Sequence, residues 1–229
     1  QLMKDNGVYT HLVSDHLHYF EDGGHGFHTR FSSYDFIRGQ EYDPWVAMVE
    51  PPVDRIRAKY DERHYDVSGR DKRMQHAINR EAMTAEKDFP GPRCFASAFD
   101  FLDRNRRADD WFLMLECFDP HEPFHAPPAD LHTVDLTDAH PRTNPRPLYA
   151  AMVEAMDTEL GRLLAEMGPA FRNTNIYFMG DNGTPKAASL PPFVPQHAKL
   201  TPYEGGINVP LIVHGPAVRT AGTECNGLV

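Results

Sequence analysis

An acid, an amide and a glycine follow directly on an apolar run at Asp181, Asn182 and Gly183. The run covers residues 175–179 and has the composition of a buried parallel strand. Open α/β folds place their active sites where such strands end, at the carboxyl edge of the sheet. The side-chain oxygens of adjacent Asp and Asn residues suit Ca²⁺ or Mg²⁺ better than zinc. Because Asp-Asn-Gly is also a common turn sequence, the motif by itself is equally compatible with a plain turn.

A lysine, Lys199, precedes the sharp bend that the pair Gly205-Gly206 predicts. A cation in this place could bind a sulfate or phosphate oxygen and stabilise charge on a leaving group. The alternative is a solvated lysine before a tight turn. His197 lies two residues before Lys199 and could face the same pocket, although a lone histidine here could equally be a loop residue.

A second apolar run, residues 111–118, leads into Asp119-Pro120-His121. This order predicts a strand, buried on both faces, that places an imidazole at the same sheet edge as Asp181. Prolines on either side would hold His121 in place. His121 could then donate a hydrogen bond to a bound ester or protonate its leaving oxygen. The alternative is a structural turn with a surface histidine.

Two further histidines, His16 and His18, follow a short β-rich run at residues 8–13. Alternate residues of an extended chain point the same way, so both imidazoles could face one cleft. With Asp15 and Asp22 nearby a zinc site is conceivable, but nothing else in the spacing supports zinc. The chain has 13 histidines, so chance clustering is the alternative.

The elements between these motifs alternate along the chain. We predict helices over residues 71–87, from about Pro92 to residue 102, and over 145–167, where Asn144 is a suitable N-cap and Gly168-Pro169 ends the helix. Residues 14–45 and 126–147 read as loops, and residues 207–213 as a strand. Because Pro210 cannot donate a backbone hydrogen bond, that strand should lie at an edge or bulge. The order predicts an α/β fold with a mostly parallel, mixed sheet sandwiched by helices.

The composition is that of a globular protein, with 41% hydrophobic and 24% charged residues among 229. We expect a single domain over residues 1–229. The formal net charge of −10 argues against nucleic acid as a partner. No apolar run is long enough to span a membrane, and no signal peptide is visible, which leaves the compartment open. The three cysteines, Cys94, Cys117 and Cys225, imply no disulfide framework.

Taken together, these motifs resemble the sulfatases of the alkaline-phosphatase superfamily. The resemblance rests on residues 119–124, 178–183 and 199–213, which occur in the family's order, and on residues 149–161, which are similar to the helix before its metal-binding strand. It implies helices around a mixed sheet, one bound Ca²⁺, with Mg²⁺ as an alternative, and hydrolysis of a sulfate ester of a small molecule or carbohydrate.

The same resemblance assigns roles to individual residues. Asp181 and Asn182 match the family's second pair of metal ligands, Lys199 its substrate lysine and His121 its substrate histidine. His18 matches the histidine of the family's Lys-x-His pair, whose lysine is missing here.

The chain departs from the family at the nucleophile. That residue is a cysteine or serine in Cys/Ser-x-Pro-x-Arg, matured to formylglycine, and none of the three cysteines has this context. We therefore expect formylglycine and the first aspartate ligands upstream of Gln1. The chain would then be the middle of a sulfatase, without its N-terminal catalytic segment and C-terminal subdomain, and inactive by itself.

Two other functions stay open at this point. One is a phosphodiesterase or phosphonate monoester hydrolase of the same superfamily. Its two-zinc members place a histidine where Asn182 stands, so the amide favours the sulfatase type. The other is a non-catalytic binding protein that keeps the fold without the nucleophile.

Overall fold

The structure is a computed structural model. It describes residues 1–59, 72–122, 124–126, 133–139, 144–186, 188–189 and 195–225. The chain divides into two compact units, Gln1–Leu163 and Leu164–Val229, and each is described by itself. The expectation of one domain over residues 1–229 stays a prediction.

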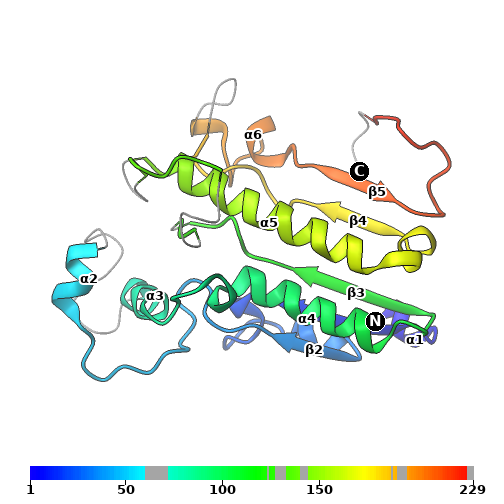
Figure 1. The fold of residues 1–229 in the computed structure, drawn as a ribbon, viewed down its shortest axis with the longest axis horizontal. Coiled ribbons are helices and arrows are strands. Elements are labelled where there is room, and N and C mark those ends of the chain that lie inside the picture. The colour runs from blue at the N-terminus through cyan, green and yellow to red at the C-terminus, as the bar shows by residue number, and fades with distance from the viewer. Residues whose placement is uncertain are drawn as a thin grey trace. The chain divides into compact units, whose positions relative to one another are not determined.

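A three-stranded parallel sheet organises the first unit (Figure 1). Its central strand is β1 (Tyr9–Ser14), flanked by β2 (Ser33–Phe36) and β3 (Trp111–Glu116). Both flanking strands pair with β1 in parallel. All carboxyl ends therefore meet at one edge, and the loops that follow β1 and β3 begin there. The predicted strands at residues 8–13 and 111–118 are thus confirmed as β1 and β3.

Two details of the predicted sheet are wrong. All six residues of β3 are half-buried rather than buried on both faces, because β3 is an edge strand of this sheet. Residues 14–45 are not all loop, since they contain β2. That strand has no apolar run to reveal it, and side-chain contacts hold it in place. Tyr9 donates a hydrogen bond to Ser33 Oγ at 3.0 Å, and His11 Nδ1 lies 2.7 Å from the same oxygen.

Helices pack on this sheet and beside it. Besides α1 (Leu2–Asp5), they are α2 (Val53–Lys59), α3 (Lys72–Glu81), α4 (Pro90–Arg104) and α5 (Arg146–Glu166). Figure 1 shows α4 running alongside β3. Phe95 and Ala98 of α4 form a core with Leu163 of α5, against which Leu113 and Leu115 of β3 pack. A separate core of Ile56, Met74, Ala77 and Ile78 joins α2 to α3.

The predicted helices are confirmed with shifted bounds. The helix expected over residues 71–87 ends at Glu81, because the backbone N–H groups of Thr84 and Ala85 donate instead to the carboxylate of Asp88. The next helix begins at Pro90 rather than near Pro92. The long helix agrees closely with α5, and residue 71 lies outside the described residues.

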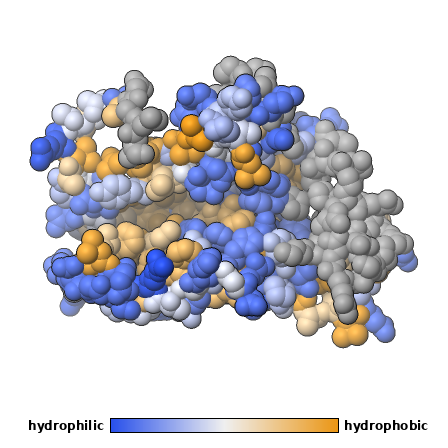
Figure 2. Space-filling view, turned by 180° about the vertical axis from the view of Figure 1, so that it is seen from behind, coloured by the Kyte–Doolittle hydropathy of each residue, from blue (hydrophilic) through white to orange (hydrophobic). Residues whose placement is uncertain are grey.

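The second unit contains one antiparallel strand pair, β4 (Ile176–Met179) and β5 (Leu211–His214), and the short helix α6 (Glu204–Ile207). The prediction of a buried parallel strand at residues 175–179 is wrong here. The chain returns from β4 to β5 without a crossover that would make the pair parallel. With one neighbouring strand, three of its four residues are exposed, including Tyr177 at 62% and Met179 at 66%. Figure 2 shows separate hydrophobic patches, in orange, among mainly hydrophilic residues on one face of the molecule.

The strand expected over residues 207–213 is also shorter than predicted. Ile207 closes α6, and β5 begins only after Pro210. The carbonyl of Pro210 accepts a hydrogen bond from Gly180 N–H at 3.1 Å. The prediction of an edge position for this strand is confirmed, since β5 has β4 as its one neighbour in the described sheet, and Pro210 itself has no N–H to extend the strand pair.

Candidate functional site

Two of the predicted site histidines meet at one carboxylate. His18 lies in a 3-10 turn after β1 (Leu17–Tyr19), and His121 lies in the loop after β3. The Nε2 atom of His18 is 3.4 Å from Oε2 of Glu41, and Nδ1 of His121 is 3.0 Å from Oε1 of the same residue. The structure thus brings together two residues that are far apart in sequence, through a third that the sequence analysis did not select.

The ring of His18 has a carboxylate at each nitrogen. Its Nδ1 atom lies 2.8 Å from Oε2 of Glu21, opposite the contact with Glu41. A carboxylate only accepts hydrogen bonds, and an imidazole carries hydrogen on both nitrogens only as the imidazolium. Both nitrogens of the His18 ring therefore already face a carboxylate at the end of β1.

The ring of His121 is oriented through one nitrogen. Nδ1 lies 2.6 Å from the backbone carbonyl of Glu122, and this oxygen, like the Glu41 carboxylate, can only accept. Nδ1 must therefore be the donor, which fixes the tautomer of the neutral ring. The ring also packs on Phe118, with centroids 4.6 Å apart. Pro123, which the sequence analysis expected to stiffen this loop, lies outside the described residues.

His16 contacts the ring of His18 edge to face, with centroids 5.3 Å apart, but pairs with a different carboxylate. Its Nδ1 atom is 3.1 Å from Oε1 of Glu116, which also accepts hydrogen bonds from Tyr19 and Ser14. Burial by itself raises the pKa of Glu116, but these hydrogen bonds outweigh it and leave the pKa below its usual range. Burial, with the charge of Glu116, raises the pKa of Tyr19 to about 12. Glu116 is therefore an ionised anchor for His16, while both histidine rings lie against Phe118.

The zinc alternative finds no support in the part of the chain that the structure describes. There, no group of three or more His, Cys, Asp or Glu side chains is placed to hold a metal ion. Asp15, one of the residues considered for zinc, is fully buried and accepts the backbone N–H of Phe118 at 2.8 Å.

A fully buried carboxyl group, Asp15, and a half-buried one, Asp119, lie at this edge of the sheet. Burial raises the pKa of Asp15 well above its usual range, and the charge of Asp119 adds to the effect. Burial also raises the pKa of Asp119, against the opposing influence of Arg80 and a hydrogen bond from Gln40. The second oxygen of Asp15, Oδ2, has no hydrogen-bond partner. A proton on Asp15 is therefore favoured by the fold.

This pair makes the stability of the protein depend on pH. The pKa of Asp15 is raised on folding, so the fold favours the protonated carboxyl. This contribution to the free energy of unfolding is complete at pH values below the usual pKa range of aspartate, and it is lost as the pH rises through the pKa that Asp15 has in the folded protein. We expect Asp15→Asn to be more stable than the natural protein at pH 7.5, by about 1.4 kcal/mol for each unit of pKa shift removed. The amide oxygen can still accept the Phe118 N–H.

Denaturant unfolding at about pH 4 and pH 7.5 measures this difference. The gain in the free energy of unfolding from Asp15→Asn should be smaller at pH 4 than at pH 7.5. Asp109→Asn, at an exposed position, should change the free energy of unfolding little at either pH. An Asp15→Asn protein that is destabilised equally at both pH values would show that Asp15 is ionised in the fold.

The two glycine-containing motifs of the second unit lie side by side. Gly183 N–H donates to the Gly206 carbonyl at 2.9 Å, and Lys199 N–H donates to the Thr184 carbonyl at 3.0 Å. A Cβ atom added at Gly183 would stand 2.0 Å from the carbonyl oxygen of Gly205. Only glycine permits this approach, so the loop that follows Asp181 and Asn182 is held against the segment that carries Lys199.

The remaining site predictions concern residues of the same unit. Asp181 is exposed, and its Oδ1 accepts the backbone N–H of Asn182 at 2.8 Å. The Lys199 side chain is half-buried. His197 is exposed and stacks on Tyr203, with ring centroids 3.7 Å apart, so its ring has a packing partner. Substrate binding by His197, and a shared edge for Asp181, His121 and Lys199, stay predictions.

Comparison with known proteins decides the family. A family model described as Sulfatase matches residues 1–224. This chain belongs to the sulfatase family. The resemblance drawn from the sequence motifs is therefore confirmed. In the described residues of this sulfatase-family chain, no helix has the length and apolar character needed to cross a bilayer.

Solved structures support the α/β fold predicted for this sulfatase-family chain. The crystal structure of Ps i-CgsB in complex with k-i-k-neocarrahexaose is 21% identical, with a TM-score of 0.56, and the match covers 94% of this chain and 46% of that one. A second crystal structure of Ps i-CgsB is 22% identical with the same TM-score and coverage. The likeness is one of fold, and the chain spans about half the length of these structures. The search of curated proteins finds no match.

Proposed function

We propose that this chain takes part in the hydrolysis of a sulfate ester. The observation that carries the proposal is the meeting of His18 and His121 at the carboxylate of Glu41. Each histidine follows a parallel strand at the edge where α/β folds bind ligands. Membership of the sulfatase family supports sulfate esters as the substrate class.

The two histidines would act on different parts of the ester. His18 would bind an oxygen of the sulfate group in place of one of the two carboxylates that face its ring nitrogens. His121 is held through Nδ1, which carries a hydrogen, so it is the doubly protonated ring that would donate a hydrogen bond to the ester or protonate the leaving oxygen through Nε2. These are the electrostatic and acid roles that sulfate transfer needs.

Residues of the second unit would supply further charge. We propose that Lys199 contacts the transferring sulfate group and that His197 lies near it. Asp181 and Asn182 offer two hard oxygens, which fit Ca²⁺ or Mg²⁺ in kind. They are too few for a tight Ca²⁺ site by themselves, since Ca²⁺ takes 6–8 oxygen ligands. A cation bound there would polarise the sulfate oxygens.

The natural substrate proposed is a sulfated small molecule or carbohydrate. One of the two Ps i-CgsB structures is a complex with k-i-k-neocarrahexaose, which supports a carbohydrate. A phosphodiesterase or phosphonate monoester hydrolase is the second candidate. The amide of Asn182 disfavours it, because two-zinc sites use imidazole at such positions.

Paired esters test the proposal. The natural full-length protein, supplied with Ca²⁺, is assayed on an aryl sulfate, a sulfated oligosaccharide and a bis-aryl phosphate. We expect the larger kcat/KM on the sulfates, with a loss of rate after chelation that Ca²⁺ restores. Faster hydrolysis of the phosphate diester would support the second candidate. Binding of sulfated ligands without turnover of any ester would indicate a non-catalytic binding protein.

A further inference from the structure

We propose that Glu41 is a positioning residue, which holds His18 and His121 at a fixed separation through its single carboxylate. What the two histidines do to a substrate rests on the proposed function above. The bridge itself does not, because it is a property of the folded chain.

Both oxygens of Glu41 face a histidine. The side chain is 14% exposed, with Oε1 at 3.0 Å from His121 and Oε2 at 3.4 Å from His18, and the contact of Oε2 is one of charge because this oxygen makes no hydrogen bond. Two other carboxylates in the described residues each approach one of these histidines. Glu21 lies 2.8 Å from His18, and Glu122 lies 3.8 Å from His121. Glu41 is thus placed to tie the loop after β1 to the loop after β3.

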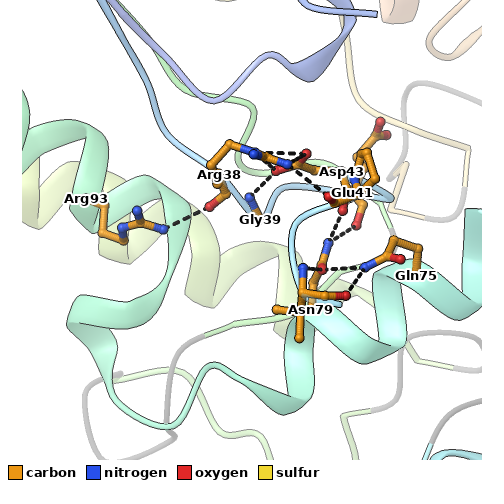
Figure 3. A network of polar contacts seen from close by, with 9 residues as sticks. Arg38, Gly39, Glu41, Asp43, Gln75, Asn79 and Arg93 are labelled. Atoms are coloured by element: carbon orange, nitrogen blue, oxygen red, sulfur yellow. Dashed lines mark hydrogen bonds and ion pairs between the residues drawn. The ribbon is translucent and has the colours of Figure 1, made fainter. Parts of the chain in front are cut away.

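The backbone of Glu41 is held in an unusual conformation. Its φ of 45° lies in the left-handed region, which a non-glycine residue adopts only where its surroundings require it. Its carbonyl accepts hydrogen bonds from His76 at 3.1 Å and from Asn79 at 3.4 Å, both on α3 (Figure 3). Such a strained position indicates that the direction of this side chain matters.

The loop around Glu41 is itself closed by a buried carboxylate. Asp43 accepts two close hydrogen bonds from the guanidinium of Arg38, at 2.8 Å each, and one from Gly39 N–H at 2.7 Å (Figure 3). A Cβ at Gly39 would come within 2.7 Å of the Trp45 ring, so glycine is required there. The loop therefore presents Glu41 from a rigid base.

The residue before Glu41 fixes that base to the other histidine loop. Gln40 is buried, and its Nε2 donates to Oδ1 of Asp119 at 2.8 Å, while its Oε1 accepts from Arg80 at 2.7 Å. Asp119 lies two residues before His121. Gln40 thus contacts Asp119, and the adjacent Glu41 contacts His121. Two neighbouring residues of one loop therefore hold the loop that carries His121, as a positioning role requires.

A spectroscopic comparison of three matched variants tests the bridge. Glutamine has the shape of glutamate but carries no charge and has an amide NH₂ in place of one oxygen, so it cannot face two histidines in the same way. We record the ring ¹⁵N signals of His18 and His121 in the protein and in Glu41→Gln, Glu21→Gln and Glu122→Gln. Glu41→Gln should change both rings. Glu21→Gln should act mainly on His18, and Glu122→Gln mainly on His121.

A Glu41→Gln protein that stays folded, yet leaves one or both histidine rings unchanged, would overturn the bridge. This result does not depend on turnover, so it is separable from a failure of the proposed function. The protein could hydrolyse no ester while Glu41→Gln still changes both histidine rings and each of the other two variants changes mainly one. That result would support the bridge and would contradict the proposed sulfatase activity.

Kinetics on the full-length protein give a second readout. If Glu41 positions the histidines, Glu41→Gln should lower kcat for a sulfate ester about 10- to 100-fold, the usual effect of losing a residue that orients reacting groups. Glu50→Gln, at an exposed loop position, should leave kcat unchanged. A lower KM with kcat preserved would overturn positioning, because it would show that the Glu41 carboxylate competes with the sulfate group for the histidines.

Discussion

Replacement of Lys199 by alanine should lower turnover of a sulfate ester about a hundredfold. One charge-stabilising contact in a desolvated site contributes about 3 kcal/mol to lowering the barrier, which corresponds to that factor. The hydrogen bond from the Lys199 backbone N–H to the Thr184 carbonyl should survive the substitution, because alanine keeps this N–H. Steady-state kinetics on the full-length protein measure the change.

Lys186 provides the matched control for this prediction. It is an exposed lysine of the same unit, so Lys186→Ala removes the same charge at another place. Its rate should stay near that of the natural protein. Equal rates for Lys199→Ala and Lys186→Ala would remove Lys199 from the proposed chemistry and leave only its structural role beside Thr184.

His121→Ala should lower turnover by about a hundredfold or more, since general acid catalysis contributes about 10²- to 10⁴-fold. If His121 protonates the leaving oxygen, the loss should grow as the leaving group becomes more basic. A series of aryl sulfates with leaving phenols of increasing pKa therefore measures the role directly. The control is His25→Asn, at an exposed histidine whose φ of 60° asparagine tolerates.

The dependence on leaving group separates two roles of His121. A loss that is constant across the series would mean that His121 binds or orients the ester without transferring a proton. No loss at all would place the chemistry elsewhere and would leave the contact with Glu41 without a catalytic purpose.

Much of the first unit could be predicted because its elements carry local patterns. The apolar runs of β1 and β3 and the proline- or glycine-bounded helices α4 and α5 are visible without tertiary information. Strand β2 is not, because its place in the sheet depends on contacts with Tyr9 and His11 from another strand. The prediction of a parallel neighbour for β4 is wrong, since an apolar run does not reveal the direction of the strand beside it.

The candidate site shows the same limit. His18 and His121 could be selected because each follows a strand, and the pair Gly205-Gly206 predicted a sharp bend after Lys199, whereas the close approach of Gly183 to Gly205 appears only in the structure. Glu41 follows neither a strand nor a recognised motif. Its importance comes from a left-handed backbone and from partners that are distant in sequence, and no local pattern encodes these.

The central claim is that His18 and His121 bind the sulfate group of an ester. A crystal structure of the full-length protein with an unreactive sulfamate analogue of the substrate tests it most directly. The account predicts an oxygen of the sulfamate group within hydrogen-bond distance, about 3 Å, of a ring nitrogen of each histidine. A sulfamate group that binds elsewhere, with both histidine rings still paired only with their carboxylates, would contradict it.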